Sequence, residues 1–99
     1  MTIRIEKNGS TLLLAPEGRL DTLTAPQLEA AVKENLADAA SLTFDFEKLE
    51  YVSSAGLRVL LSAEKAMNAK GGSMKVCRVN ETIMEVFEVT GFSDILTIE

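Results

Sequence analysis

The first residues of the chain alternate between apolar and polar side chains, which is the pattern of β-strands. Residues 2–18, TIRIEKNGSTLLLAPEG, alternate, break at a turn signal around Asn8–Gly9 and then continue as an apolar run. Strands joined by such a tight turn pair antiparallel as a β-hairpin. The sequence therefore predicts that the sheet opens with an antiparallel pair of strands.

Three later segments change to the spacing of amphipathic helices, with apolar residues at every third or fourth position. They lie within residues 19–39, 54–70 and 80–91. Thr24 and Asn80 belong to the residue types that cap helix N-termini, and glycines follow the second and third segments, where helices commonly stop. The sequence therefore predicts three helices.

Further strands are predicted between and after these helices. Residues 41–46 alternate with one apolar face, residues 73–79 form a short apolar run, and residues 94–98 form another. Residues 47–52 are interpreted as a connection. The order β-β-α-β-α-β-α-β predicts a single α/β domain over residues 1–99, with a mixed sheet, an antiparallel opening pair of strands and helices packed against the sheet.

Composition and charge narrow the functional classes. The chain has 99 residues, a formal net charge of −5 and a pI of about 4.7. Nucleic acids and anionic membranes attract basic surfaces, so neither is an expected partner. The apolar runs are too short to span a bilayer, and residues 1–10 lack the regions of a secretory signal. Because the single cysteine, Cys77, has no internal disulfide partner, we expect a cytoplasmic protein.

The residues that carry most enzyme chemistry are absent. With no histidine and one cysteine, the chain forms neither a Cys/His zinc site nor a Ser–His or Cys–His nucleophile pair. The glycine-rich phosphate-binding motifs are also missing, and the pair Gly71–Gly72 is too short to replace one. We therefore expect no enzymatic activity, no metal and no cofactor.

Two polar clusters follow predicted strands, where functional groups gather in open α/β sheets. They are GRLDT, residues 18–22, and YVSSAG, residues 51–56, which opens the second helix. The serines Ser53 and Ser54 have two interpretations. A serine caps the helix, which stabilises it by about 1 kcal/mol. Alternatively, a serine is phosphorylated and gains about −1.5 to −2 charges at the helix end that tolerates anions. Capping does not explain Gly56, whose small neighbours leave the backbone open to close approach.

Three segments, in order, resemble the STAS-domain anti-sigma factor antagonists of bacteria over nearly the whole chain. Residues 17–29, EGRLDTLTAPQLE, look like the opening motif of the family. Residues 42–61, LTFDFEKLEYVSSAGLRVLL, look like its phosphoacceptor segment, and residues 71–96, GGSMKVCRVNETIMEVFEVTGFSDIL, are similar to its closing strand, helix and turn. The resemblance implies one STAS domain.

The resemblance also implies a regulatory activity. In this family the unphosphorylated antagonist binds an anti-sigma factor, often itself a serine kinase, and thereby releases a sigma factor for transcription. Phosphorylation of one serine at the start of the second helix breaks the complex, and a phosphatase restores it. Anchoring on Gly56 and Leu57 places the acceptor at Ser54, with Ser53 as the second candidate. Well-studied members carry aspartate at the position of Ser53.

Further site residues follow from the same resemblance. Asp21 matches the acidic residue of the family near the acceptor, and its alternative role is to cap or brace the first helix. We expect a monomer. The expected partner-binding residues are Asp21, Thr22, Ser53, Ser54, Gly56, Leu57 and Arg58.

Other function classes stay open at this point. Related domains serve as accessory subunits of transport complexes, and small-ligand or nucleotide sensing has been suggested for the fold. The missing phosphate loop argues against tight nucleotide binding. An enzyme with a Ser53 or Ser54 nucleophile lacks a general base.

Overall fold

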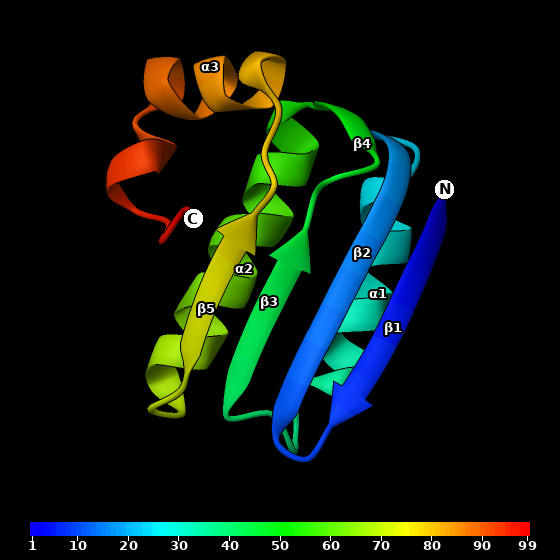
Figure 1. Cartoon of the computed structure of the whole chain (residues 1–99), viewed down its shortest axis with the longest axis vertical. Helices are drawn as coiled ribbons and strands as arrows, with labels where there is room; N and C mark the ends of the chain where they lie inside the picture. The colour runs from blue at the N-terminus through cyan, green and yellow to red at the C-terminus, as the bar shows by residue number, and fades with distance from the viewer.

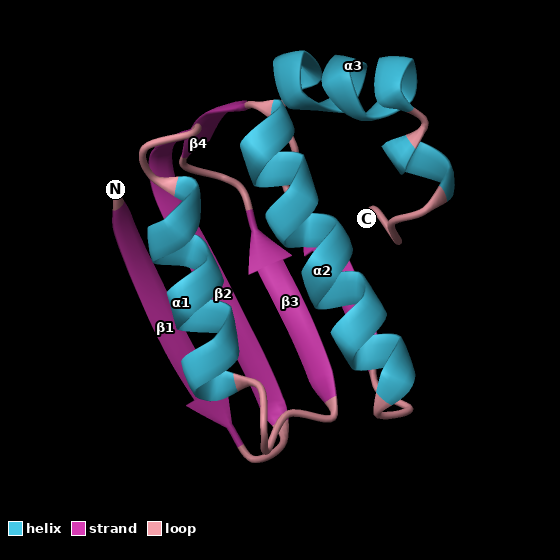
Figure 2. Cartoon of the chain, turned by 180° about the vertical axis from the view of Figure 1, so that it is seen from behind, coloured by secondary structure: helices cyan, strands magenta, loops and turns pink.

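A five-stranded sheet carries two helices on one of its faces, as the computed structural model of all 99 residues shows (Figures 1 and 2). Helices α1 and α2 lie side by side on that face, while α3 crosses one end of the sheet. In chain order the elements are β1 (Thr2–Asn8), β2 (Thr11–Leu20), α1 (Ala25–Asn35), β3 (Ser41–Asp45), β4 (Leu49–Val52), α2 (Ser54–Ala69), β5 (Ser73–Cys77), α3 (Glu81–Thr90) and the 3₁₀ turn η1 (Phe92–Asp94).

The long strand β2 organises the sheet because it has three neighbours. It pairs antiparallel with β1, parallel with β3 along its first half, and parallel with β4 at its end. Strand β5 pairs parallel with β3. The antiparallel opening pair and the mixed sheet predicted from the sequence are therefore confirmed.

Pro16 marks the place where β2 changes partner. It lies between Leu14, the last residue paired with β3, and Gly18, the first residue paired with β4. Proline has no backbone N–H and is excluded from the interior of a continuous sheet. Here it is tolerated because β2 has no parallel partner between Leu14 and Gly18.

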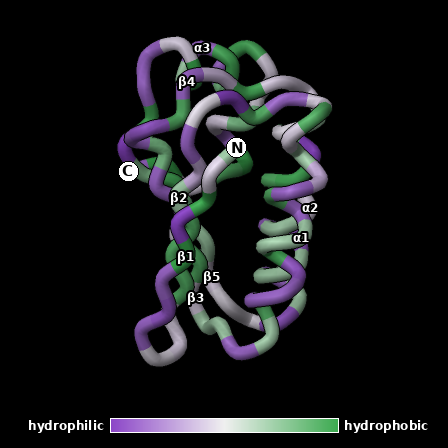
Figure 3. Tube along the Cα trace, turned by 90° about the vertical axis from the view of Figure 1, so that its right-hand side faces the viewer, coloured by the Kyte–Doolittle hydropathy of each residue, from purple (hydrophilic) through white to green (hydrophobic).

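The core fills the space between the sheet and the two helices. Figure 3 shows these two layers from the side, with the strands opposite α1 and α2. Helices α1 and α2 cover one face of the sheet, and each buries one apolar stripe against it. Full burial of one such side chain stabilises the fold by about 1.5–3 kcal/mol. The fully buried large side chains are Phe44, Phe46, Phe87, Leu12, Leu14, Leu20, Leu28, Leu42, Leu49, Leu60, Met67 and Ile83.

Helix α3 is held against the end of the sheet by its N-cap. The Asn80 side chain accepts a hydrogen bond from Ile83 N at 2.8 Å, as predicted for a cap residue. The same side chain donates to the carbonyl oxygen of Leu49 at 3.0 Å. One residue therefore both starts α3 and ties it to β4.

Two segments differ from the sequence prediction. Residues 49–52, interpreted as a connection, form strand β4, which pairs parallel with residues 18–20 at the end of β2. Residues 94–98, predicted as a strand, form no strand: the amide groups of Ile95 and Leu96 bond back to the carbonyl of Phe92. This turn leaves a single bridge between Ile98 and Val76.

Asn80→Ala tests the double role of this cap. Losing the cap and the bond to Leu49 should lower the free energy of unfolding by about 1–2 kcal/mol, since a cap alone contributes about 1 kcal/mol. Urea denaturation measures the change. Asn68→Ala, at an exposed position on α2, is the control and should stay within about 0.5 kcal/mol of the wild-type protein. Equal stability of the two variants would contradict the role of Asn80.

Candidate functional site

The two polar clusters predicted from the sequence meet at one end of the sheet. Strands β2 and β4 are parallel neighbours, so the segments that follow them emerge together (Figure 1). A hydrogen bond from Ser53 N to Leu20 O, 2.8 Å long, joins the two segments directly. The turn at Asp21 and the start of α2 therefore form one surface region.

Ser53 occupies the N-cap position of α2, with extended backbone angles (φ −98°, ψ 177°). Its hydroxyl makes no capping bond. The Oγ atom is buried and has no hydrogen-bond partner. Because the oxygen is shielded from solvent, another protein reaches it poorly while the domain is folded.

Ser54 differs from Ser53 in both position and exposure. It is the first residue of the 16-residue helix α2, and its side chain is exposed. Of the two serines for which a capping role was considered, Ser53 holds the N-cap position without a side-chain capping bond, and Ser54 is the first helical residue. The first turn of a helix presents free backbone N–H groups and the positive end of the helix dipole. An anion attached at Ser54 is therefore compatible with the folded helix.

Gly56 and Leu57, expected at the partner surface, lie inside the domain. A Cβ atom on Gly56 would approach Leu20 Cγ to 2.6 Å and Val52 Cγ2 to 2.8 Å. The first turn of α2 therefore packs against the ends of β2 and β4, and this packing explains the glycine. Leu57 is buried in the core. Among the expected contact residues of α2, Ser54 and Arg58 are the exposed ones.

Asp21 organises the turn between β2 and α1. Its Oδ1 atom accepts hydrogen bonds from Leu23 N at 3.0 Å and Thr24 N at 3.1 Å. The hydroxyl of Thr24 donates to Arg19 O at 2.8 Å instead of capping the helix, although Thr24 holds the predicted N-cap position. The bond from Thr24 N is the main cause that lowers the pKa of Asp21 below its usual value. Asp21 thus braces the turn, and the neighbouring Thr22 is exposed.

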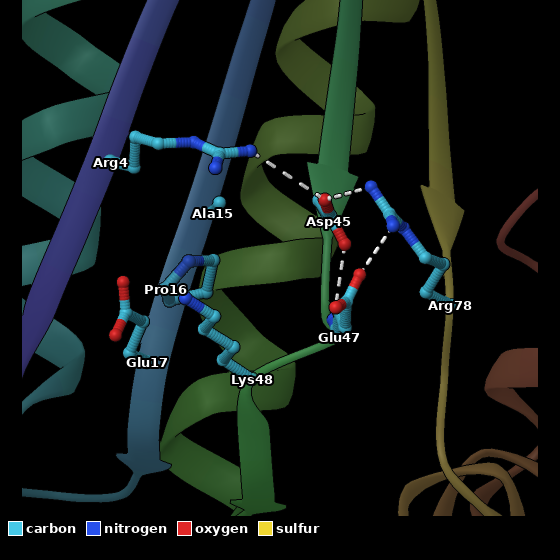
Figure 4. A pocket seen from close by; sticks show the side chains of 8 residues that line it. All are labelled: Arg4, Ala15, Pro16, Glu17, Asp45, Glu47, Lys48 and Arg78. Carbon is cyan, nitrogen blue, oxygen red and sulfur yellow. Dashed lines mark hydrogen bonds and ion pairs between the residues drawn. The ribbon is translucent and has the colours of Figure 1, made fainter.

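A separate group of charged side chains lies on the face of the sheet away from α1 and α2 (Figure 4). We call it the Asp45 cluster. The buried carboxylate of Asp45 accepts from Arg78 at 2.8 Å and from Glu47 N at 3.1 Å, and Arg78 also pairs with Glu47. Asp45 and Glu47 raise the pKa of the Arg78 guanidinium. A cavity of about 290 Å³ adjoins the cluster. Its lining residues are Arg4, Ala15, Pro16, Glu17, Asp45, Glu47, Lys48 and Arg78.

This cluster was not predicted from the sequence, although one signal for it is present there. Asp45 is the one charged residue of the alternating segment 41–46, on the face opposite Phe44 and Phe46, and its side chain is buried. A buried carboxylate needs a cation or several donors. Arg78 supplies the charge after β5, with a left-handed backbone (φ 55°). The cluster connects β3 to the start of the segment that leads to α3.

Two other structural findings bear on function. The chain contains no helix of the length and apolarity that crossing a membrane requires. No group of three or more acidic or sulfur side chains is arranged to hold a metal ion.

Comparisons with known proteins identify relatives over the full domain. A family model described as the STAS domain matches residues 2–99. The protein BtrV of Bordetella bronchiseptica is 30% identical over 99 residues, which cover 99% of this chain and 85% of BtrV. The anti-sigma-B factor antagonist of Bacillus subtilis is 26% identical over 98 residues, which cover 99% of this chain and 90% of that protein.

Solved structures share the fold. The anti-sigma factor antagonist SpoIIAA in its unphosphorylated form has a TM-score of 0.86 and 19% sequence identity, covering 99% of this chain and 88% of that chain. An anti-sigma factor antagonist from Mycobacterium paratuberculosis has a TM-score of 0.87 and 23% identity, covering 98% of this chain and 83% of that chain. The fold class predicted from the sequence is confirmed.

Gly56→Ala tests the tight junction beneath the site. At an open helix position this change stabilises a protein by up to about 1 kcal/mol. Here the added methyl group collides with Leu20 and Val52, so the free energy of unfolding should fall by about 1–3 kcal/mol. Chemical denaturation gives the value, and Ser62→Ala, at an exposed position of α2, is the control. A more stable Gly56→Ala variant would show that the junction has spare room.

The lowered pKa of Asp21 predicts a pH dependence of stability. A carboxyl group with a lower pKa in the folded state contributes stability above its unfolded pKa, and this contribution is lost as pH falls through the folded pKa. Between neutral pH and about pH 3, wild-type protein should lose more stability than Asp21→Asn, which does not titrate. Urea denaturation at several pH values measures both. Parallel curves for the two proteins would contradict the prediction.

Proposed function

The chain belongs to the STAS domain family, and we propose that it is an anti-sigma factor antagonist whose docking surface is switched by phosphorylation of Ser54. The unphosphorylated chain binds an anti-sigma factor and so frees a sigma factor for transcription. The phosphorylated chain does not bind. The chain is a substrate in this cycle, and it catalyses no reaction.

One observation carries the assignment of the switch to Ser54. Its side chain is exposed at the start of α2, beside the Asp21 turn, whereas the hydroxyl of Ser53 is buried. A kinase has to bring its active site to the hydroxyl oxygen, and of these two serines Ser54 is the exposed one. Ser54 is therefore the acceptor, and Ser53 holds the backbone at the helix start.

Relatives support this function. The Bacillus subtilis relative is named as an antagonist of an anti-sigma-B factor, and a Paenibacillus polymyxa relative as an antagonist of an anti-sigma F factor. SpoIIAA, which shares the fold, has been solved both unphosphorylated and phosphorylated. In this chain, the partner is an anti-sigma factor that is also a serine kinase, and a phosphatase reverses the modification.

The physical effect of the phosphate is local. It adds about −1.5 to −2 charges and three oxygen acceptors to a residue that is exposed. The net charge of the chain falls from −5 to about −7. The helix start accommodates the anion, so the domain keeps its fold while the surface becomes bulkier and more negative. Binding is lost through repulsion and desolvation at the docking surface.

Substitutions at Ser54 test the switch. Ser54→Asp should weaken binding to the anti-sigma factor kinase encoded in the same genome by about tenfold or more, because it places a charge at the interface. Ser54→Ala should bind like the wild-type protein and accept no phosphate. Titration calorimetry measures affinity, and mass spectrometry after incubation with the kinase and ATP locates the phosphate.

The control is Ser62→Asp, which adds the same charge at an exposed position of α2 outside the first turn and should leave affinity unchanged. Equal affinity of wild-type protein, Ser54→Asp and Ser54→Ala, or a phosphate on Ser53, would refute the proposed switch.

A further inference from the structure

Strand β1 forms an open edge of the sheet. It lies at one end of the strand order, and Figure 1 shows no strand or helix beyond it. The opposite edge is partly covered, because Val76 of β5 exchanges backbone hydrogen bonds with Thr97 and Glu99 near the end of the chain. An uncovered edge strand presents unpaired N–H and C=O groups, to which another strand can bind.

The pairing with β2 determines which backbone groups of β1 point outward. Ile3 lies opposite Pro16. Proline has no N–H, so these two residues cannot exchange both hydrogen bonds and form a non-hydrogen-bonded pair of the antiparallel ladder. Such pairs recur at every second residue. Ile3, Ile5 and Lys7 therefore direct their N–H and C=O groups away from β2.

The order of side chains along β1 is complementary to itself. Ile5 is the midpoint of this seven-residue strand. If two copies pair antiparallel about Ile5, all seven residues are matched, the outward backbone groups face one another, and Arg4 lies opposite Glu6 of the second copy. The next registers on either side place Arg4 opposite Arg4 or Glu6 opposite Glu6. Opposite charges across a strand pair stabilise it, and like charges destabilise it.

The exposure of Ile5 and the local charge also fit a second copy. Ile5 pairs with the buried Leu14 and shares its face of the sheet, yet 44% of Ile5 is exposed. Across the proposed pair the two Ile5 side chains would cover each other. The strand carries two positive side chains, Arg4 and Lys7, and one negative, Glu6, although the chain as a whole has a net charge of −5. The edge therefore does not share the negative charge that keeps copies apart.

We propose that β1 is a self-association edge, at which a second copy of this chain pairs antiparallel about Ile5 and joins the two sheets into one. The strand contains none of the residues of the proposed docking surface, so the inference does not rest on the proposed function. It differs from the monomer expected from the sequence. A contact along one strand edge buries less area than a standard interface, so the dimer should be weak, with a dissociation constant of about micromolar or above.

Charge reversal on β1 tests the proposed register. Sedimentation equilibrium of the wild-type chain, up to millimolar concentration, should show a reversible monomer–dimer equilibrium. Arg4→Glu should weaken this association by about tenfold or more, because it sets carboxylates against each other at two symmetric positions. The double variant Arg4→Glu/Glu6→Arg exchanges the charges and should restore it. The control Lys65→Glu makes the same change of charge at an exposed position of α2 and should leave association unchanged.

Three results would overturn the proposal. They are a wild-type chain that stays monomeric at millimolar concentration, an Arg4→Glu variant that associates like the wild-type protein, and a folded double variant that associates as weakly as Arg4→Glu. Urea denaturation shows whether the variants are folded.

Amide hydrogen exchange of the wild-type chain tests the same interface without any substitution. The amides of Ile3, Ile5 and Lys7 should exchange more slowly as protein concentration rises, because the second copy accepts their hydrogen bonds. The amides of Arg4 and Glu6 already bond to β2, so their exchange should depend little on concentration. If dimers form while the exchange of Ile3, Ile5 and Lys7 stays the same, the copies meet elsewhere and the proposal is wrong.

Discussion

The pairing of β2 with two parallel strands in succession is the constraint on which the functional end of the molecule depends. β3 leaves β2 after Leu14, and β4 takes its place from Gly18 onward. The hydrogen bond from Ser53 to Leu20 then extends the contact beyond the strands. Without this second pairing, the Asp21 turn and the start of α2 would be two unrelated loops. The change of partner also accounts for the proline inside β2.

The pattern of apolar and polar residues predicted most of the fold, because most helices and strands are long enough to show the full helical or strand repeat. The opening hairpin, the three helices and the strands near residues 41–46 and 73–79 were visible in this way. β4 was missed because its four residues are too few to show a period, and its partner lies far earlier in the chain. The prediction of a strand at residues 94–98 was wrong because an apolar run is common to strands and to turns that bury a side chain, as this turn buries Leu96.

The site was predicted less completely, since its residues differ by their surroundings more than by their type. Family resemblance suggested Ser54 and Asp21 as site residues, but adjacent serines look alike in a sequence, and only the folded chain separates a buried hydroxyl from an exposed side chain. Leu23 is exposed, but its residue type does not distinguish it from the buried Leu20 and Leu28 nearby in the sequence. Gly56 was noticed as an oddity, but its cause, the side chains of Leu20 and Val52, comes from two other elements.

The absence of space beneath Gly56 has a consequence for timing. If the start of α2 were loosely packed, modification of its first turn would shift the helix, and the change in partner binding would depend on that motion. Here the first turn packs tightly against the ends of two strands. Under the proposed switch, a phosphate on Ser54 therefore changes the surface and leaves the fold in place. The domain then has no second conformation that would persist after the phosphate is removed. Under the proposed switch, the fraction of the protein that carries phosphate at any moment is set by the balance between the kinase and the phosphatase.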